Sequence, residues 1–285
     1  MNDAMLSPLA PPAHAALKAR FAIAWVLPVS VMLAAWQSPW LAWATMAGWQ
    51  LALALLERVP ALRHSPPATV QGAWHRWCIR VHVPLQAGLL ATGLWITVTH
   101  GLSVAAVVAL ALGVGGVAGS QGITFAHELG HSRSRLDRVL GWLLMGSVNY
   151  AHFMVEHYRG HHPRAATHDD PASARRGESL WRFLPRTLAG GLRSAWRLEA
   201  QQLKQLKRGW HRSPLLWATA AQVVWLVVLA ALGPLAFARR VNPPPCSPLE
   251  STPSRSQRRH AIDIACTVSL FFVKHLTRKG VERDE

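Results

Sequence analysis

The stretch VHVPLQAGLLATGLWITVTHGLSVAAVVALALGVGGVAGSQGITFAHELGH (residues 81–131) contains no Asp, Glu, Lys or Arg before Glu128. A helix needs about 20 consecutive apolar residues to cross a bilayer, so residues 81–126 are long enough for two crossings. Thr99-His100-Gly101 offers the turn between them. The stretch closes on His127-Glu-Leu-Gly-His131. We therefore expect a helical membrane hairpin with a histidine pair at its end.

Other parts of the chain have the same uncharged character. Residues 21–56 carry no charge and are interrupted at Gln37-Ser38-Pro39, and residues 213–238 form another uncharged run. Only 15% of the 285 residues are charged and 51% are hydrophobic, against about a quarter charged in soluble domains. The predicted fold class is all-α, a polytopic membrane helix bundle. Its apolar segments are expected at 21–37, 40–56, 81–99, 102–126, 139–155 and 213–238.

The predicted domain organisation has three parts. Residues 1–20 form an N-terminal segment without the features of a signal peptide, residues 21–238 form the membrane domain, and residues 239–285 form a basic tail expected to be disordered. The formal net charge of +16 comes mostly from arginines that flank the apolar runs. This placement favours membrane lipid over nucleic acid as the partner of the charge. Cys78, Cys246 and Cys266 have neither metal-site nor disulfide spacing.

The charge pattern also predicts the orientation. Both hairpin tips are uncharged, and the basic residues share the other side of the predicted bundle. These basic residues are Lys18, Arg20, the loop with Arg58, Arg63, Arg76 and Arg80, and the stretch Arg133–Arg138. By the positive-inside rule, the N-terminus and the histidine clusters face the cytoplasm.

A second histidine cluster, Glu156-His157-Tyr-Arg-Gly-His161-His162, follows about thirty residues after the first. Residues four apart share a helix face, so His127 should pair with His131 and His157 with His161. Convergent neutral imidazoles are typical of a transition-metal site. HELGH alone also fits a zinc peptidase with Glu128 as general base, but such a site has no use for three more histidines.

The segment 139–155 separates the two clusters. It has only 17 residues and contains Asn149 and His152. A full crossing would put the clusters on opposite membrane faces, so we expect this segment to be re-entrant or interfacial. Gly130 and Gly160 precede His131 and His161, which indicates either close backbone approach at the metal or simple helix ending.

Polar residues 163–212 follow the second cluster. The run from Thr167 to Ser179 indicates an ordered loop, and Ser194–Lys207 is typical of an amphipathic helix. Tryptophans in the apolar segments favour either interfacial anchoring or the lining of a substrate path; they are Trp25, Trp36, Trp40, Trp43, Trp49 and Trp95.

Three motifs together resemble the membrane alkane 1-monooxygenases, within the membrane fatty acid desaturase and hydroxylase superfamily. They are the two histidine clusters and the stretch Asp170-Pro171-Ala-Ser-Ala-Arg175 to Gly177-Glu178-Ser179. The resemblance covers roughly residues 20–238. The E-H-x-x-G-H-H box with this extension is specific for the alkane and xylene hydroxylase branch, whereas HxxxH indicates only the superfamily.

The resemblance implies two iron ions at the cytoplasmic ends of the membrane helices, held by His127, His131, His157, His161 and His162. It implies no catalytic residue beyond this metal centre and no other cofactor-binding residue, and His152 and His168 lie outside its pattern. The implied reaction uses O2 to hydroxylate the terminal methyl of an alkane dissolved in membrane lipid. Electrons would come through rubredoxin reductase and rubredoxin, at a bacterial inner (plasma) membrane.

The sequence departs from this family in its last part. The family has a further N-Y-x-x-H-Y-G-type motif and a third H-x-x-H-H box, and this sequence contains neither; after His211 only His260 and His275 remain. Five imidazoles are fewer than two irons take in the family, so we expect a truncated and inactive chain. The change to a proline-rich, arginine-rich composition after Ala238 indicates a reading-frame change there.

Three other functions remain open from the sequence. A xylene monooxygenase-like or fatty acid desaturase-like enzyme would act on aromatic methyl groups or acyl chains. An intramembrane zinc peptidase would use HELGH alone. A membrane remnant without activity would bind no metal.

Overall fold

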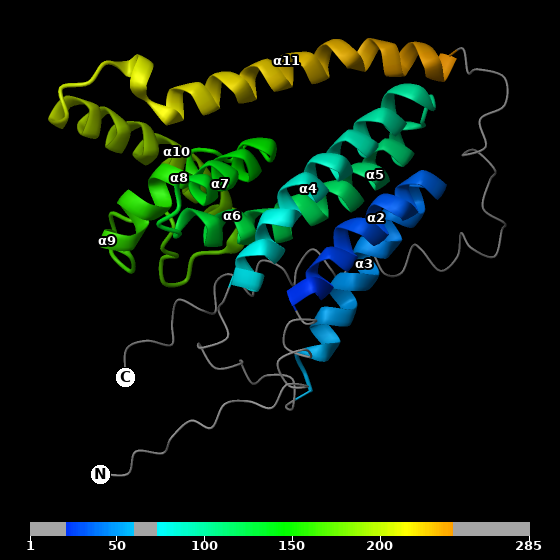
Figure 1. Cartoon of the computed structure of the whole chain (residues 1–285), viewed down its shortest axis with the longest axis horizontal. Helices are drawn as coiled ribbons and strands as arrows, with labels where there is room; N and C mark the ends of the chain where they lie inside the picture. Colours follow the sequence, from blue (N-terminus) through cyan, green and yellow to red (C-terminus); the bar gives the residue numbers. More distant parts are fainter. Residues whose placement is uncertain (1–20, 60–72, 242–285) are drawn as a thin grey trace.

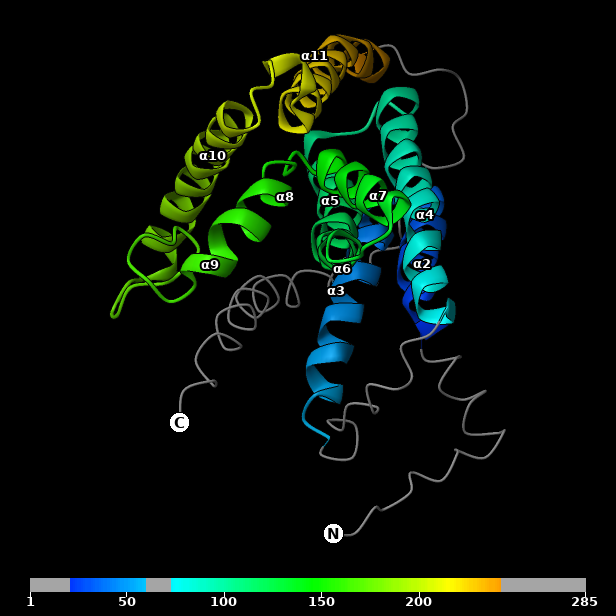
Figure 2. The same cartoon turned by 60° about the vertical axis from the view of Figure 1, so that its left-hand side comes forward.

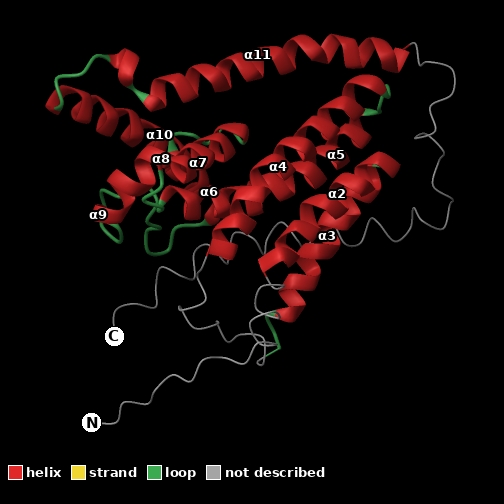
Figure 3. Ribbon diagram, viewed as in Figure 1, coloured by secondary structure: helices red, strands yellow, loops and turns green. Residues whose placement is uncertain are grey.

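The computed structural model describes residues 21–59 and 73–241, the last eight of these by their backbone only. Helices account for every regular element in these ranges, and no strand occurs there (Figure 3). This confirms the all-α prediction. The predicted N-terminal segment 1–20 and nearly all of the basic tail 239–285 lie outside the described residues.

Four helices form the first half of the bundle. They are α2 (Val26–Gln37, preceded by the short helix η1, Ile23–Trp25), α3 (Pro39–Leu56), α4 (Ala73–Thr99) and α5 (Val104–Val117). They lie side by side in both views (Figures 1 and 2). Apolar side chains from all four make one core, because burying apolar surface is the main favourable term in packing; among them are Leu27, Val31, Met46, Leu89, Ile96, Leu110 and Val114.

Two short breaks turn the chain within this bundle. Ser38 is extended (φ −165°), and its hydroxyl accepts a hydrogen bond from Trp40 N, while Pro39 occupies the first helical position. Such N-caps satisfy a free N–H of the first helical turn. Between α4 and α5, Gly101 adopts a positive φ of 57°, which glycine tolerates best. The breaks predicted at 37–39 and 99–101 are confirmed.

Within the described residues, three helices are long and apolar enough to cross a membrane: Ala73–Thr99, Val104–Gly130 and Pro214–Gly233. The second joins α5, a π-helical turn η4 (Ala118–Gly122) and α6 (Ile123–Gly130). The apolar helix over Ile23–Gln37 is shorter. These lengths are those of a membrane-type helix bundle.

The prediction that Arg76 and Arg80 lie in a loop is wrong. Both lie on α4, which starts at Ala73, eight residues before the uncharged run begins. The segment AWHRWCIR contains no helix breaker, and a helix can extend beyond the apolar layer with its arginines in the polar zone. Arg80 Nε donates a 2.7 Å hydrogen bond to Asp137 Oδ1, which joins α4 to α7 (Arg135–Ser147).

Replacing Arg80 with Met should lower the free energy of unfolding by about 2 kcal/mol, because it leaves the buried Asp137 carboxylate without its charged partner. Burial opposes ionisation of Asp137, but hydrogen bonds from Arg80 and Ser132 outweigh it and hold the pKa of this carboxyl below its ordinary value. The stabilisation is therefore present above about pH 4 and is lost as the pH falls through the lowered pKa. Denaturation in detergent at pH 7 and pH 3 measures both effects.

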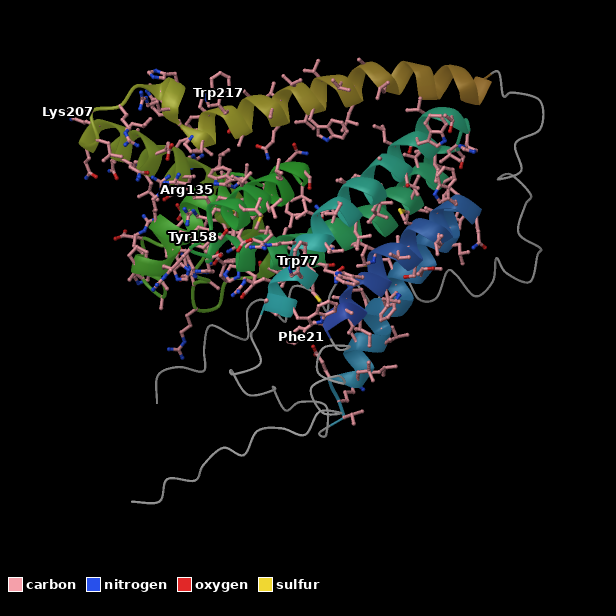
Figure 4. All side chains as sticks on the ribbon, viewed as in Figure 1. Phe21, Trp77, Arg135, Tyr158, Lys207 and Trp217 are labelled. Carbon is pink, nitrogen blue, oxygen red and sulfur yellow. The ribbon has the colours of Figure 1, made fainter. Side chains whose placement is uncertain are left out.

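Arg135→Met is the matched control, since Arg135 is exposed on α7 (Figure 4). If the Arg80 and Arg135 variants lose equal stability at pH 7, the ion pair does not join these helices in the way described.

The tryptophans predicted to line a path or to anchor the bundle fall into two groups. Trp36, Trp40 and Trp95 are exposed on the bundle surface. Trp25 donates its ring N–H to Cys78 O at 2.8 Å, and Trp49 donates to Ser30 Oγ at 3.1 Å. These positions favour anchoring and interhelical packing over the lining of a path.

The second half of the described chain packs beside this bundle. It comprises α7, α8 (Phe153–Glu156), the π-helical turn η5 (His157–His161), α9 (His162–Arg164), α10 (Leu180–Gln205), η6 (Trp210–Arg212) and α11 (Pro214–Val241). α10 packs against α8 and η5, and α11 contacts α4 and α7 as it passes across the top of the view in Figure 1. The predicted amphipathic helix at Ser194–Lys207 lies largely within α10, after an ordered loop over 165–179.

The predicted segment 139–155 is not one continuous helix. α7 ends at Ser147, and a turn in which Asn149 has a φ of 57° leads to α8. The chain therefore reverses between the two histidine clusters, which returns the second cluster to the first. Whether this segment enters a membrane stays a prediction.

Candidate metal centre

The first histidine box lies at the end of the helix over Val104–Gly130. His127 is in the last turn of α6 and His131 caps it, so both rings lie on one face as the spacing of four predicts. Their Nε2 atoms are 3.2 Å apart, within hydrogen-bond distance when one ring nitrogen is protonated and the other is not. The prediction that His127 pairs with His131 is confirmed.

The second box differs from the regular helix that the sequence predicts. His157–His161 is a π-helical turn, in which hydrogen bonds join residues five apart. The His157 ring meets the His162 ring edge to face at 4.5 Å, while it stacks on His161 at 5.4 Å. The wider turn thus brings His162, rather than His161, to the His157 face that meets the first box.

The two boxes converge on one point. Ligand nitrogens of His127, His131 and His157 lie within 4.8 Å of one another. His162 joins them, with its Nε2 3.4 Å from His131 Nε2. A single ion bound by nitrogens at about 2.0–2.1 Å holds them roughly 3–3.5 Å apart. The four rings are therefore close to the arrangement that a metal ion requires.

His157 is the central ring of this group. Its Nε2 is buried and has no hydrogen-bond partner. Burial, together with the surrounding imidazoles, lowers the pKa of His157 to about 3. A neutral imidazole with a free, buried nitrogen is the form that binds a transition metal. These residues therefore fit a bound metal ion.

His161 has a different partner. Its Nδ1 lies 2.8 Å from Asp170 Oδ2, and Asp170 is fully buried. Ser173 Oγ and Ala172 N also donate to the Asp170 carboxylate and fix its orientation. A carboxylate on one ring nitrogen orients a histidine and leaves the other nitrogen as a ligand.

Asp170→Asn should weaken metal binding by about 10–100-fold, because the amide orients His161 less firmly. Asp169→Asn, a change at the exposed neighbour, is the control and should leave the affinity unchanged. Titration of purified protein with Co²⁺, followed by absorbance, compares the two variants. Equal affinities would show that His161 does not depend on Asp170.

Tyr158 locks the two boxes together. Its hydroxyl donates to His127 O at 2.8 Å, and its ring packs edge to face on His131 at 4.7 Å. A Cβ on Gly130 would overlap the Tyr158 ring and hydroxyl. A Cβ on Gly160 would overlap Glu156 and Arg164. Both glycines therefore permit close approach, which was one of the two expectations from the sequence.

Ion pairs hold the second box against α10. Arg164 donates to Glu156 Oε1 at 3.0 Å and to Ser194 Oγ at 2.8 Å. Arg159 pairs with Glu199, whose other oxygen accepts from Ser213 Oγ at 2.7 Å. Burial raises the pKa of Glu156, which Ser194 and Arg164 partly offset. The π-helical turn is thus fixed from the side opposite the first box.

The sequence indicates Asp170 only as part of a motif, and it indicates no role for Tyr158, Glu156 or Glu199. A charged residue directly before Pro171, in an otherwise polar loop, was the available signal for Asp170. Nothing in the local pattern distinguishes Tyr158 from other aromatic residues, because its contact is 31 residues away. His168 is exposed and His152 packs on Tyr150, and neither belongs to the four-ring group.

Comparison with known proteins agrees with this geometry. The family model described as fatty acid desaturase matches residues 101–240. The chain is 30% identical over 223 residues to an alkane 1-monooxygenase of Pseudomonas putida, which covers 73% of this chain and 54% of the relative. It is 39% identical over 166 residues to alkane 1-monooxygenase 2 of Pseudomonas aeruginosa. This match covers 57% of this chain and 44% of the relative.

A shorter match reaches 45% identity over 91 residues with an alkane 1-monooxygenase of Acinetobacter baylyi, covering 32% of this chain and 22% of the relative. The chain spans about half the length of the first two relatives. The matched residues 101–240 include both histidine boxes, and therefore the histidines whose rings converge. By its match to the fatty acid desaturase model and its similarity to these relatives, the chain belongs to the alkane monooxygenase family, within the fatty acid desaturase superfamily.

Proposed function

We propose that the histidine centre binds iron and serves the O2-dependent hydroxylation of a hydrocarbon's terminal methyl group. The observation that carries this proposal is the convergence of His127, His131 and His157 from boxes thirty residues apart. Bound iron would supply the activation of O2, which protein side chains cannot provide alone. The relatives are alkane 1-monooxygenases by name, which supports an alkane as substrate.

The chain's own residues hold the ligands in place. Tyr158 fixes the end of α6 through His127 O, Asp170 orients His161, and burial keeps His157 neutral. Pre-orientation matters because ligands that must reorganise bind metal more weakly. The helices over Ala73–Thr99 and Val104–Gly130 are apolar along their length, so a hydrocarbon dissolved in lipid has access to the bundle that bears the centre.

We propose that the full diiron set is incomplete in this sequence. The five box histidines supply four converging rings and His161 beside them, whereas two irons with imidazole ligands require more donors. Iron analysis of purified protein tests this directly. Fewer than two irons per chain, together with little turnover, supports the truncation hypothesis, and two irons per chain with turnover would reject it.

Product analysis tests the reaction class. The full chain, expressed with a rubredoxin and its reductase, is supplied with octane, xylene or a fatty acyl substrate under O2. Octan-1-ol that disappears in the His157→Ala variant supports the alkane assignment even if the yield is small. A methylbenzyl alcohol or an unsaturated acyl chain instead would favour the xylene or desaturase alternative. Zinc in place of iron, with no oxidised product, would contradict the proposal.

The electron donor and the location in the cell are also proposals. Arg133, Arg135 and Arg138 follow the first box closely, and an acidic electron carrier such as rubredoxin would be attracted to such a surface. By the positive-inside rule these arginines face the cytoplasm of a bacterial plasma membrane. Protease accessibility at residues 133–138, or thiol labelling of a Ser134→Cys variant, in sealed vesicles of known orientation would test this placement.

A further inference from the structure

A cavity of about 180 Å³ lies where α10, η6 and α11 meet. Three arginines line it, Arg159, Arg208 and Arg212, together with a single acid, Glu199. None of the four converging rings of the metal centre is among its lining residues. The volume holds a group the size of several waters, since one water takes about 30 Å³ in the liquid.

The charges in this cavity are not balanced by the protein. Glu199 is buried, and both of its oxygens are engaged, one by Arg159 and the other by Ser213 Oγ. Arg159 NH1 is buried and has no hydrogen-bond partner. Arg208 and Arg212 are exposed, and within residues 21–59 and 73–233 their side chains make no recorded hydrogen bond or ion pair. Arg208 and Arg212, which line the cavity, therefore present unpaired guanidinium donors to a ligand, while Arg159 adds positive charge behind them.

The cavity lies at the start of an apolar helix. Pro214, which lines it, is the first residue of the span Pro214–Gly233. Trp210 and Trp217 are exposed on either side of this point, and Trp217 donates its ring N–H to His211 O at 2.8 Å. Figure 4 shows Lys207 at the corner where α10 turns toward α11, and Trp217 on the first turns of α11. Exposed tryptophans beside basic residues mark the level of lipid headgroups.

We propose that this cavity binds the phosphate of an anionic phospholipid headgroup. Guanidinium groups match phosphate oxygens in charge and in fork geometry, and anionic lipids attract basic segments at the membrane surface. A lipid is favoured over free phosphate because α11, whose first residue Pro214 lines the cavity, continues as an apolar span. Val223, Val224 and Val227 are exposed along it, where the acyl chains of the same lipid would lie.

The test uses the full chain purified in a non-ionic detergent. Phosphatidylglycerol, phosphatidylcholine and inorganic phosphate are titrated separately, and bound ligand is measured by native mass spectrometry. Two double variants with the same loss of charge are compared: Arg208→Gln/Arg212→Gln, and Arg193→Gln/Arg197→Gln. The second pair is exposed on α10 and does not line the cavity.

We expect saturable binding of phosphatidylglycerol that weakens about thirtyfold in the Arg208/Arg212 variant, since each of the two basic residues near an anionic surface contributes about 1 kcal/mol and about 1.4 kcal/mol corresponds to a factor of ten in affinity. Binding should change less than twofold in the Arg193/Arg197 variant. Equal losses in the two variants would overturn the proposal, because they would show only a general effect of surface charge. Binding of phosphatidylcholine as tight as that of phosphatidylglycerol would also overturn it.

Titration with inorganic phosphate distinguishes the two possible sources of the bound phosphate group, a lipid headgroup and a free phosphate ion. Phosphate that competes only weakly with phosphatidylglycerol supports the lipid. Saturable phosphate binding that depends on Arg208 and Arg212, with no retention of phosphatidylglycerol, would reject the lipid and assign the cavity to a soluble phosphate group. Metal content should be unchanged in the Arg208/Arg212 variant, because neither arginine contacts a histidine of the boxes.

Discussion

Replacing His157 with alanine will reduce the affinity of the protein for Co²⁺ by more than about 100-fold, a larger loss than the 10–100-fold that follows from disturbing a ligand's supporting residue. The His157 ring lies 4.5 Å from the His127 ring, 5.6 Å from His131 and 4.5 Å from His162. His131 also contacts rings of both boxes, at 4.6, 5.6 and 5.0 Å, but within this four-ring group only His157 has a buried Nε2 without a hydrogen-bond partner. Its loss removes a ligand and also opens the buried side of the centre.

His168→Ala is the matched control. His168 follows the second box closely but is exposed and outside the group of rings. Its removal should leave Co²⁺ affinity within twofold of the wild type. Absorbance titrations in the visible range, with circular dichroism to confirm that both variants remain helical, decide the comparison. If both substitutions weaken binding alike, the ion is not held where the rings converge.

Gly130→Ala should either displace Tyr158 or lower the free energy of unfolding by about 3 kcal/mol. This value is in the upper part of the range for overpacking a tight contact. The new Cβ would occupy the space of the Tyr158 hydroxyl and ring. Because this hydroxyl bonds to His127 O, the substitution should also separate the boxes and weaken Co²⁺ binding. Unfolding in denaturant and the Co²⁺ titration measure the two effects separately.

Gly115→Ala provides the control on the same continuous helix. A Cβ at Gly115 meets nothing within 4 Å, so this change should stabilise the helix by about 0.5–1 kcal/mol, the usual difference between alanine and glycine. If Gly130→Ala behaves like Gly115→Ala, Tyr158 does not approach the first box closely, and its contacts do not hold the two boxes together.

The helices that the sequence predicts best are those with a purely apolar signal. The uncharged run 81–126 and its break at Thr99–Gly101 correspond to α4 and α5 with a turn at Gly101. Their starts and ends were predicted less well, because Arg76 and Arg80 extend α4 beyond the uncharged residues. Charge marks the edge of the apolar layer, whereas the edge of a helix depends on caps and breakers.

The candidate site was only partly predictable for a different reason. Spacing identified the five histidines, since a repeat of four residues is a local property. The π-helical turn at His157–His161 is not visible in spacing, and it exchanges the positions of His161 and His162 relative to the first box. Tyr158 and Asp170 act through contacts with residues distant in the sequence or across a loop, which a single sequence does not reveal.

The central claim is that both histidine boxes bind the same metal ion. The most direct measurement is the number of tightly bound Co²⁺ ions per chain in wild type, His131→Ala, His157→Ala and the double variant. A shared centre predicts that either single substitution removes the same ion and that the double variant loses no more. Two ions lost independently, one for each box, would contradict the account.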